Sequence, residues 1–402
     1  MKSRWGLDCN IFPDIMLFAI FFLIKYFYSS DKKVDNKLDS KYLYLAFGFI
    51  AISAYSYATS YVALTVFCIL LFAYCLKTKT INVRQIIVST LIVLVITWPL
   101  ITFIIINFFD LPAVKLPFCT IPRLHINSMN SQTILRSKNI LYTIINNIIS
   151  TLKVLIFQQD GIYWNSIRGI GIYYLFSFPL FLIGVYTYIR GKKDSIADSI
   201  FVIWLIAGFI LCLSLKEVNI NRINFALIPI IYFIIKGFNS IFEIKIMRTI
   251  SFIVVLLSFS FFTYRYIDYN MKKENGILIN GYNTIVRDCF ATDMGELVEY
   301  LDSLNTKRIN IVGICLEPHI YVLYYLKTNP LDFRRNKNFD LMSYEELMSF
   351  DKWDFVSPKS SDDLIKDRNI AYVLDERNIS LIDEREHDID HFLKYIIVRS
   401  KN

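Results

Sequence analysis

The chain has 402 residues, of which 55% are hydrophobic, and its formal net charge is +8. Soluble domains are about 45–50% apolar, so this composition argues against an ordinary soluble protein. Apolar runs of about 17–23 residues recur, which is the length a helix needs to cross a membrane. The basic residues lie in short loops between these runs, so membrane orientation explains the positive charge and no nucleic-acid partner is expected.

The apolar runs predict about eight transmembrane helices. In chain order they cover residues 11–28, 42–57, 61–76, 86–109, 172–189, 199–215, 223–235 and 249–266. Basic short loops at 30–41, 77–85, 190–198 and 236–248 alternate with the loops at 58–60, 110–171 and 216–222. Because basic short loops stay in the cytoplasm, we expect the amino terminus, the long loop and everything after Tyr266 to be extracytoplasmic.

Residues 110–171 form the long polar loop of the predicted transmembrane domain, 1–266. Within this loop, residues 137–158 place isoleucine and leucine at helical spacing and put asparagine, threonine, serine and lysine on the other side. A helix with this pattern lies flat in the membrane interface. The sequence therefore predicts that the loop and its amphipathic interfacial helix roof a site at the membrane surface.

Residues 267–402 differ in composition and predict a small C-terminal extracytoplasmic α/β domain. Charged residues become frequent, and short β-like runs at 308–312, 355–356, 370–374 and 395–398 alternate with helical stretches at 292–304 and 319–326. Such alternation is typical of an α/β fold. Ser343 and Glu346 have the spacing of a capping box, which predicts a further helix beginning there.

Polar side chains that are costly in a membrane gather at the predicted outer ends of the spans. Arginine binds phosphate oxygens through charge-assisted hydrogen bonds, and aromatic rings stack on sugars. These chemistries predict a site for a sugar carried on a lipid phosphate. The candidate binding residues are Arg4, Asp8, Asn10, Tyr55, Tyr57, Arg123, His125, Trp164, Arg168, Asn221, Arg222 and Asn224.

Simpler interpretations of these residues stay open. Tyr55 and Tyr57 also fit an aromatic belt at the membrane interface. Arg4 and Asp8 could pair with each other, and His125 could be a hydrogen-bonded loop residue. The four histidines are dispersed and the chain has no Cys-x-x-Cys pair, so no metal site is predicted.

Several short segments resemble, in their order, bacterial membrane glycosyltransferases of the GT-C superfamily. The branch is that of the protein-mannosyltransferase-like and aminoarabinose-transferase-like enzymes. The resemblance covers most of residues 1–266. The segments that carry it are Arg4–Asn10, Tyr55–Tyr61, Phe118–Leu124, Gly171–Tyr174 and Asn221–Asn224.

The resemblance implies a reaction on the outer face of the bacterial plasma membrane. A hexose or pentose passes from a polyprenyl-phosphate carrier to a glycan, lipid or protein acceptor, with no nucleotide sugar and no cofactor. In the family a carboxylate in the first external loop acts in catalysis. This sequence has no matching segment, since Asp8 precedes a span that resembles a middle one. The resemblance therefore implies the later part of such an enzyme, truncated or inactive, and assigns no catalytic residue.

Two other functions compete with this one. A polytopic transporter or flippase of the cell envelope would suit the prolines at 99, 179 and 229, which could break helices, but the sequence shows no inverted repeat. The third function is a non-catalytic partner that scaffolds cell-envelope assembly.

Overall fold

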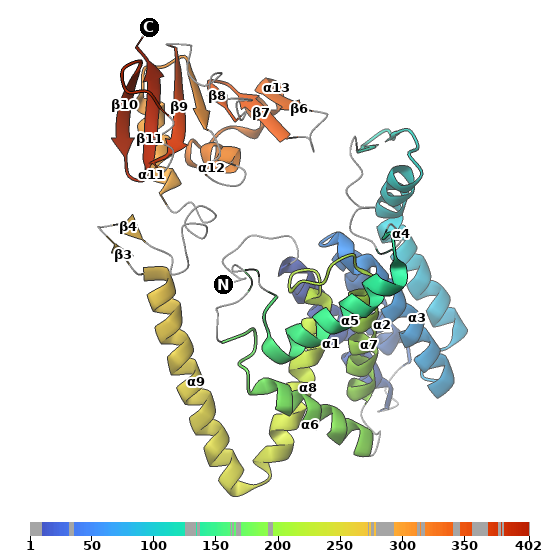
Figure 1. The fold of residues 1–402 in the computed structure, drawn as a ribbon. Coiled ribbons are helices and arrows are strands. Elements are labelled where there is room, and N and C mark those ends of the chain that lie inside the picture. Colours follow the sequence, from blue (N-terminus) through green and yellow to red (C-terminus); the bar gives the residue numbers. More distant parts are fainter. Residues whose placement is uncertain are drawn as a thin grey trace. The chain divides into compact units, whose positions relative to one another are not determined.

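The chain divides into two compact units, Met1–Phe262 and Thr263–Asn402, which we call the helical unit and the sheet unit. Figure 1 shows helices in the first unit and a sheet in the second. The structure is a computed structural model. It describes residues 10–31, 36–124, 134, 137–160, 162, 165, 170–191, 196–271, 273–274, 277–278, 293–311, 314, 318–340, 346–355, 369–376, 379 and 382–401.

Long apolar helices dominate the helical unit. They are α1 (Ile11–Asp31), α2 (Asn36–Ser53), α3 (Tyr61–Thr78), α4 (Val83–Phe108), α5 (Ile140–Phe157), α6 (Ser177–Arg190), α7 (Ile196–Ser214), α8 (Asn224–Phe242) and α9 (Lys245–Met271), with a 3-10 turn η3 (Ala58–Ser60) before α3. Among the described residues, seven segments are long and apolar enough to cross a membrane. They are Ile11–Ser29, Ala58–Thr78, Val83–Phe108, Ile140–Phe157, Ile196–Ser214, Asn224–Phe242 and Lys245–Ile267. This set fits a multi-pass membrane protein.

The seven segments differ from the eight predicted spans. The run at 42–57 gives a shorter apolar helix, Ser40–Ser53, because the backbone turns at residues 54–56. The run at 172–189 becomes α6 only from Ser177, since Gln158 accepts the hydrogen bond of the Tyr173 amide and holds the preceding turn. Conversely α5, predicted to lie in the membrane interface, has the length and composition of a span.

Aromatic stacking shows how the first helices are paired. Phe18 stacks on Phe49 and Phe22 stacks on Tyr42, so α1 and α2 run antiparallel and the start of α1 lies beside the end of α2. Phe12 of α1 stacks on Phe225 at 5.5 Å between ring centroids, which brings the start of α8 to the same place. We call this end of the helical unit, where α1, α3 and α8 begin and α2 and α7 end, the polar end.

The opposite end of the helical unit is where α2 and α4 begin. Gln85 Nε2 donates to Ser40 Oγ at 3.0 Å and holds these two helix starts together. Asn82 and Gln85 also form a reciprocal capping box that satisfies free N–H groups at the start of α4. We call this end the basic end. Exposed cations at this end include Lys25, Lys41, Lys77, Lys79, Arg84 and Arg190.

Glycines bring α6 and α8 into backbone contact. A Cβ placed on Gly184 would lie 1.9 Å from the Phe233 carbonyl oxygen, and one on Gly237 would lie 1.9 Å from the Leu180 carbonyl oxygen. Small residues allow this close approach of membrane helices, because van der Waals contact replaces the hydrophobic driving force that lipid removes. The pair of glycines therefore explains how α6 packs although it is short.

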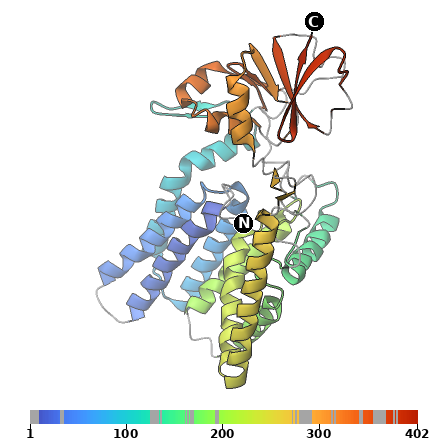
Figure 2. The ribbon, with the colours of Figure 1, turned by 90° about the vertical axis from the view of Figure 1, so that its left-hand side faces the viewer.

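The sheet unit is built on a seven-stranded mixed sheet (Figures 1 and 2). The strand order is β10-β11-β9-β5-β8-β7-β6, and β5 pairs in parallel with both β8 and β9 while the other pairs are antiparallel. The strands are β5 (Arg308–Ile311), β6 (Lys337–Asp340), β7 (Glu346–Phe350), β8 (Trp353–Asp354), β9 (Ile370–Asp375), β10 (His387–Phe392) and β11 (Tyr395–Ser400). The helices of this unit are α11 (Met294–Ser303), α12 (Pro318–Tyr325) and α13 (Pro330–Asn336). A separate two-stranded pair is formed by β3 (Lys273–Glu274) and β4 (Ile277–Leu278).

Alternating side chains of β9 and β11 fill both faces of the sheet. Ala371, Val373 and Ile397 join the core beneath α11, while Leu374 and Val398 belong to a smaller cluster on the opposite face. A strand buried on both faces is continuously apolar, which explains why the runs at 370–374 and 395–398 were recognisable from sequence.

Three of the four predicted runs coincide with β5, β9 and β11, and the run at 355–356 lies just after β8. The helix predicted from the capping box is wrong, because β7 begins at Glu346 and pairs with β6 and β8. Burial of Phe350 and Trp353 in the sheet core outweighs the local helix signal.

The Asp354 carboxyl group is expected to make the sheet unit less stable as pH rises. Burial raises the pKa of Asp354 above its ordinary value of 3.8, and the Arg308 guanidinium 3.5 Å away opposes this rise. The folded state therefore holds this proton to higher pH than the unfolded chain. The protonated carboxyl stabilises the fold fully below about pH 4, and this contribution is lost as pH rises through the folded pKa.

Arg308→Gln removes the opposing cation, so the loss is expected to extend to higher pH than in the unchanged protein. Hydrogen exchange of the β5 and β8 amides in the full chain, from about pH 4 to pH 7, measures it. Arg334→Gln, which alters an exposed arginine of α13, is the control. Identical pH profiles for the Arg308 and Arg334 variants would contradict the expectation.

Candidate functional site

The carboxylate of Asp160 joins two segments at the polar end. Its Oδ1 accepts the Ile162 amide at 3.0 Å, and its Oδ2 accepts the Asn165 side-chain amide at 2.6 Å and the Ile220 backbone amide at 2.8 Å. Hydrogen bonds to an ionised acceptor are stronger than neutral ones. The chain after α5 is thereby fixed to the turn before α8, although 60 residues separate Asp160 from Ile220.

The turn before α8 holds the best placed of the predicted phosphate ligands. The Arg222 backbone amide donates to Asn219 Oδ1 at 2.9 Å, which shapes the turn. Arg222 Nη1 donates to the Glu217 carbonyl oxygen at 3.1 Å and lies 3.7 Å from the Glu217 carboxylate. Both contacts involve Nη1, and a guanidinium carries donors on two further nitrogens. Arg222 is thus oriented at the polar end with donor capacity left.

Two buried acceptors belong to residues next to the contact between Asp160 and Ile220: Asn165 donates to the same carboxylate, and Asn221 follows Ile220 in the chain. In the part of the chain that the structure describes, Asn165 Oδ1 and Asn221 Oδ1 are buried and accept no hydrogen bond. Buried polar atoms are rarely left without a partner, because the loss of hydration is costly. These two oxygens are suited to accept hydrogen bonds from hydroxyl groups of a ligand or from water.

The structure brings together four of the twelve predicted residues. Asn221, Arg222 and Asn224 occupy the turn and the first position of α8, where Asn224 is buried. Asn10 directly precedes α1, at the end where Phe12 stacks on Phe225.

Tyr55 and Arg123 are held by partners of their own near α4. The Tyr55 hydroxyl donates to the Ile96 carbonyl oxygen at 2.7 Å. Arg123 lies 3.5 Å from the Asp110 carboxylate, and both side chains are largely exposed. No described contact links either residue to Arg222. Tyr57 directly precedes η3 and packs against the helical core, so the structure gives it a packing role.

The remaining five predicted residues lie outside the described part of the chain. They are Arg4, Asp8, His125, Trp164 and Arg168.

Asn107 anchors the segment that contains Arg123. Its Oδ1 accepts the Leu124 amide at 2.7 Å, and its Nδ2 donates to the Pro122 carbonyl oxygen at 3.3 Å. The anchored segment is a small hairpin of β1 (Val114–Lys115) and β2 (Thr120–Ile121) that follows α4. Asn107 was not recognisable from sequence, because a single asparagine within an apolar run carries no periodic signal.

Gln158 is a second anchor that the sequence did not reveal. It is buried in the left-handed conformation, with φ of 56°, and its Nε2 donates to the Tyr174 carbonyl oxygen at 2.8 Å and to Ser177 Oγ at 2.9 Å. A cavity beside it is lined mainly by apolar side chains and holds about 20 Å³. This is room for about one water molecule, so a sugar does not fit.

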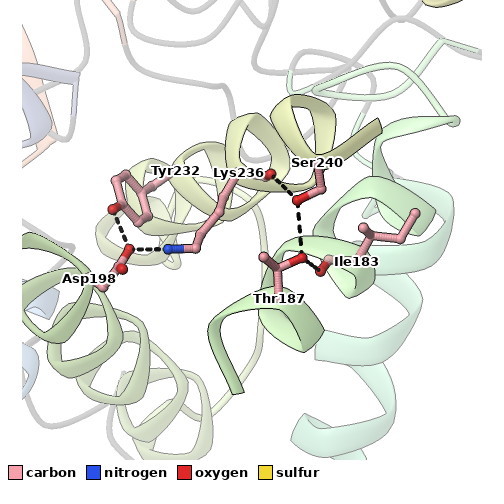
Figure 3. A network of polar contacts seen from close by, with 6 residues as sticks. All are labelled: Ile183, Thr187, Asp198, Tyr232, Lys236 and Ser240. Atoms are coloured by element: carbon pink, nitrogen blue, oxygen red, sulfur yellow. Dashed lines mark hydrogen bonds and ion pairs between the residues drawn. The ribbon is translucent and has the colours of Figure 1, made fainter. Parts of the chain in front are cut away.

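A part-buried ion pair connects the start of α7 to the last turns of α8 (Figure 3). Asp198 Oδ1 accepts hydrogen bonds from the Tyr232 hydroxyl and from Lys236 Nζ, each at 2.6 Å. Ser240, one turn after Lys236, lies 3.1 Å from Thr187 Oγ1 and so extends the network to α6. The sequence placed Asp198 and Lys236 in two separate basic loops, and 38 residues separate them.

The polar end therefore combines an oriented guanidinium with two buried oxygen acceptors, an arrangement suited to a ligand with both a phosphate and hydroxyl groups. No protein-family model, curated protein or solved structure matches this chain. The function is inferred from these side chains and from the order of the sequence segments.

Proposed function

We propose that this chain is a membrane glycosyltransferase of the GT-C type, which moves a sugar from a polyprenyl-phosphate carrier to an acceptor. The observation that supports it most is that Asp160 joins the segment of Asn165 to the turn that carries Asn221 and Arg222, with the side-chain oxygens of both asparagines unpaired. The guanidinium suits the lipid phosphate, and the two amide oxygens suit hydroxyl groups of the sugar. The proposal places this end and the sheet unit on the outer face of a bacterial plasma membrane.

In this proposal Arg222 stabilises the leaving group. When the bond between sugar and phosphate breaks, negative charge increases on the lipid phosphate, and a fixed cation beside it lowers the barrier. Asp160 is a positioning residue, because its two oxygens already accept three N–H groups. The proposal assigns the acid–base step to no described residue.

Arg222→Ala is expected to reduce sugar transfer from a polyprenyl-phosphate donor about 100-fold, because the leaving phosphate loses its cation. Arg222→Lys is expected to retain part of the activity, since lysine keeps the charge but lacks the planar guanidinium. Transfer of a radiolabelled sugar by the full-length protein in membranes measures both effects.

Arg248→Ala is the matched control, because Arg248 is exposed near the start of α9 and belongs to no part of the proposed site. Asn221→Leu tests the proposed contact with the sugar, because leucine has nearly the size of asparagine but no oxygen that can accept a hydrogen bond. Full activity of the Arg222 and Asn221 variants would overturn the proposal, provided that both accumulate in the membrane like the unchanged protein.

A lipid flippase is the second candidate, and prolines favour it. Pro99 lies inside α4 and Pro229 inside α8, and each removes one helix hydrogen bond although both helices continue through the proline. In proteoliposomes, a flippase would move the polyprenyl-linked sugar from one leaflet of the bilayer to the other without breaking the bond between sugar and phosphate. Recovery of intact donor in the opposite leaflet would favour this function over transfer.

A further inference from the structure

A shallow groove, open on its outer side, runs along one face of α2. Its volume is about 540 Å³. Its lining residues recur every three or four positions, so they share one side of the helix. They are Lys41, Tyr44, Leu45, Gly48, Phe49 and Ile52.

Gly48 keeps the middle of the groove open. A Cβ at Gly48 would meet no heavy atom within 4 Å, so the absent side chain leaves free space that no neighbour fills. Phe18 and Phe22 of α1 both stack on Phe49, which makes a rigid aromatic wall. From Lys41 to Ile52 the groove extends roughly 16 Å, at 1.5 Å per residue. Its shape and lining suit a hydrocarbon chain.

Cations stand at one end of this groove. Lys41 is its charged lining residue and belongs to the basic end of the helical unit. Lys25 Nζ lies 4.4 Å from the centroid of the Tyr42 ring, so a second ammonium group is held beside the start of α2. Lysines at the ends of membrane helices extend their charge toward the headgroup level. The groove is thus apolar along its length and positive at its head.

We propose that this groove binds an anionic phospholipid of the surrounding membrane, with one acyl chain along α2 and the headgroup phosphate against Lys41 and Lys25. The charge at the head favours a lipid with net negative charge over a zwitterionic one. The head of the groove, at Lys41, lies at the opposite end of the helical unit from Arg222, and no lining residue of the groove belongs to the proposed transfer site, so this proposal is independent of the transfer reaction.

The test uses the full chain, purified in detergent and titrated with phosphatidylglycerol while its thermal unfolding is followed. Phosphatidylglycerol is expected to raise the Tm, and Gly48→Leu, which fills the groove, is expected to weaken the apparent affinity about tenfold or more. Lys41→Gln is expected to weaken it several-fold. Val95→Leu on the exposed face of α4 and Lys77→Gln at the basic end are the matched controls and are expected to bind like the unchanged protein.

Two further ligands test whether acyl chains without a net negative charge, or a phosphate without acyl chains, would stabilise the protein equally well. Phosphatidylcholine and soluble glycerol phosphate are each expected to raise the Tm far less than phosphatidylglycerol. Equal stabilisation by phosphatidylcholine would overturn the role of the cations, and equal stabilisation by glycerol phosphate would overturn the role of the groove. Unchanged phosphatidylglycerol affinity in Gly48→Leu would also overturn the proposal.

Discussion

Replacing Gly184 or Gly237 with alanine is expected to separate α6 from α8 and to destabilise the helical unit by about 3 kcal/mol or more. Each new Cβ would lie 1.9 Å from a carbonyl oxygen of the facing helix. That oxygen belongs to the backbone, so no side-chain rotation relieves the overlap and one helix has to move. Thermal unfolding of the purified protein, together with its yield from the membrane, measures the effect.

Gly48→Ala is the matched control for this expectation. Gly48 is also a glycine within an apolar helix, but a Cβ there meets nothing within 4 Å. The control substitution is expected to be neutral or slightly stabilising, because alanine favours helix more than glycine does. If Gly184→Ala and Gly48→Ala unfolded at the same temperature, the close contact between α6 and α8 would be wrong.

Removing the lysine of the ion pair between Asp198 and Lys236 is the change with the second largest expected effect. Lys236→Met leaves the Asp198 carboxylate, 10% exposed, with the Tyr232 hydroxyl as its remaining partner in Figure 3. An ion that loses its counter-ion away from water is strongly destabilising, by about 3 kcal/mol at such a site. Thermal unfolding in detergent is expected to show this loss as a lower Tm.

The double variant Asp198→Leu with Lys236→Met distinguishes loss of a partner from loss of packing. It removes both charges, so it is expected to recover most of the stability that Lys236→Met loses. Lys245→Met, at an exposed lysine of α9, is the single-site control and is expected to leave the Tm unchanged. A double variant no more stable than Lys236→Met would contradict the proposed energetic role of the pair.

Hydropathy predicted a helical multi-pass membrane protein with an additional α/β unit, because membrane helices and strands buried on both faces each consist of a continuous apolar run. The run at 249–266 became part of α9, and the run at 395–398 became part of β11. The shortened α2 and α6 were not predictable in this way, since a turn at residues 54–56 and the Gln158 contacts end or delay each helix. The amphipathic pattern of residues 137–158 predicted an interfacial helix, whereas α5 has the length and composition of a span.

The candidate site was predictable only where polar residues are adjacent in sequence. Asn221, Arg222 and Asn224 form such a cluster, and the cost of an arginine near a span marked it. Asp160 and Asn165 were missed because Asp160 joins their segment to the turn before α8 through the Ile220 backbone amide. Ile220 is 60 residues from Asp160, and no sequence pattern specifies this contact. Asp198 was missed for the same reason, since Lys236 lies on another helix.

One consequence of the Asp160 contacts concerns motion. Since this single carboxylate holds Ile162, Asn165 and Ile220 at once, the segment after α5 and the turn before α8 must shift as one body or else give up charge-assisted hydrogen bonds. A ligand that displaces Arg222 would therefore also displace the segment after α5. We expect the Ile162 and Ile220 amides to exchange hydrogen slowly, and both exchange rates to rise together when Asp160 is replaced by alanine.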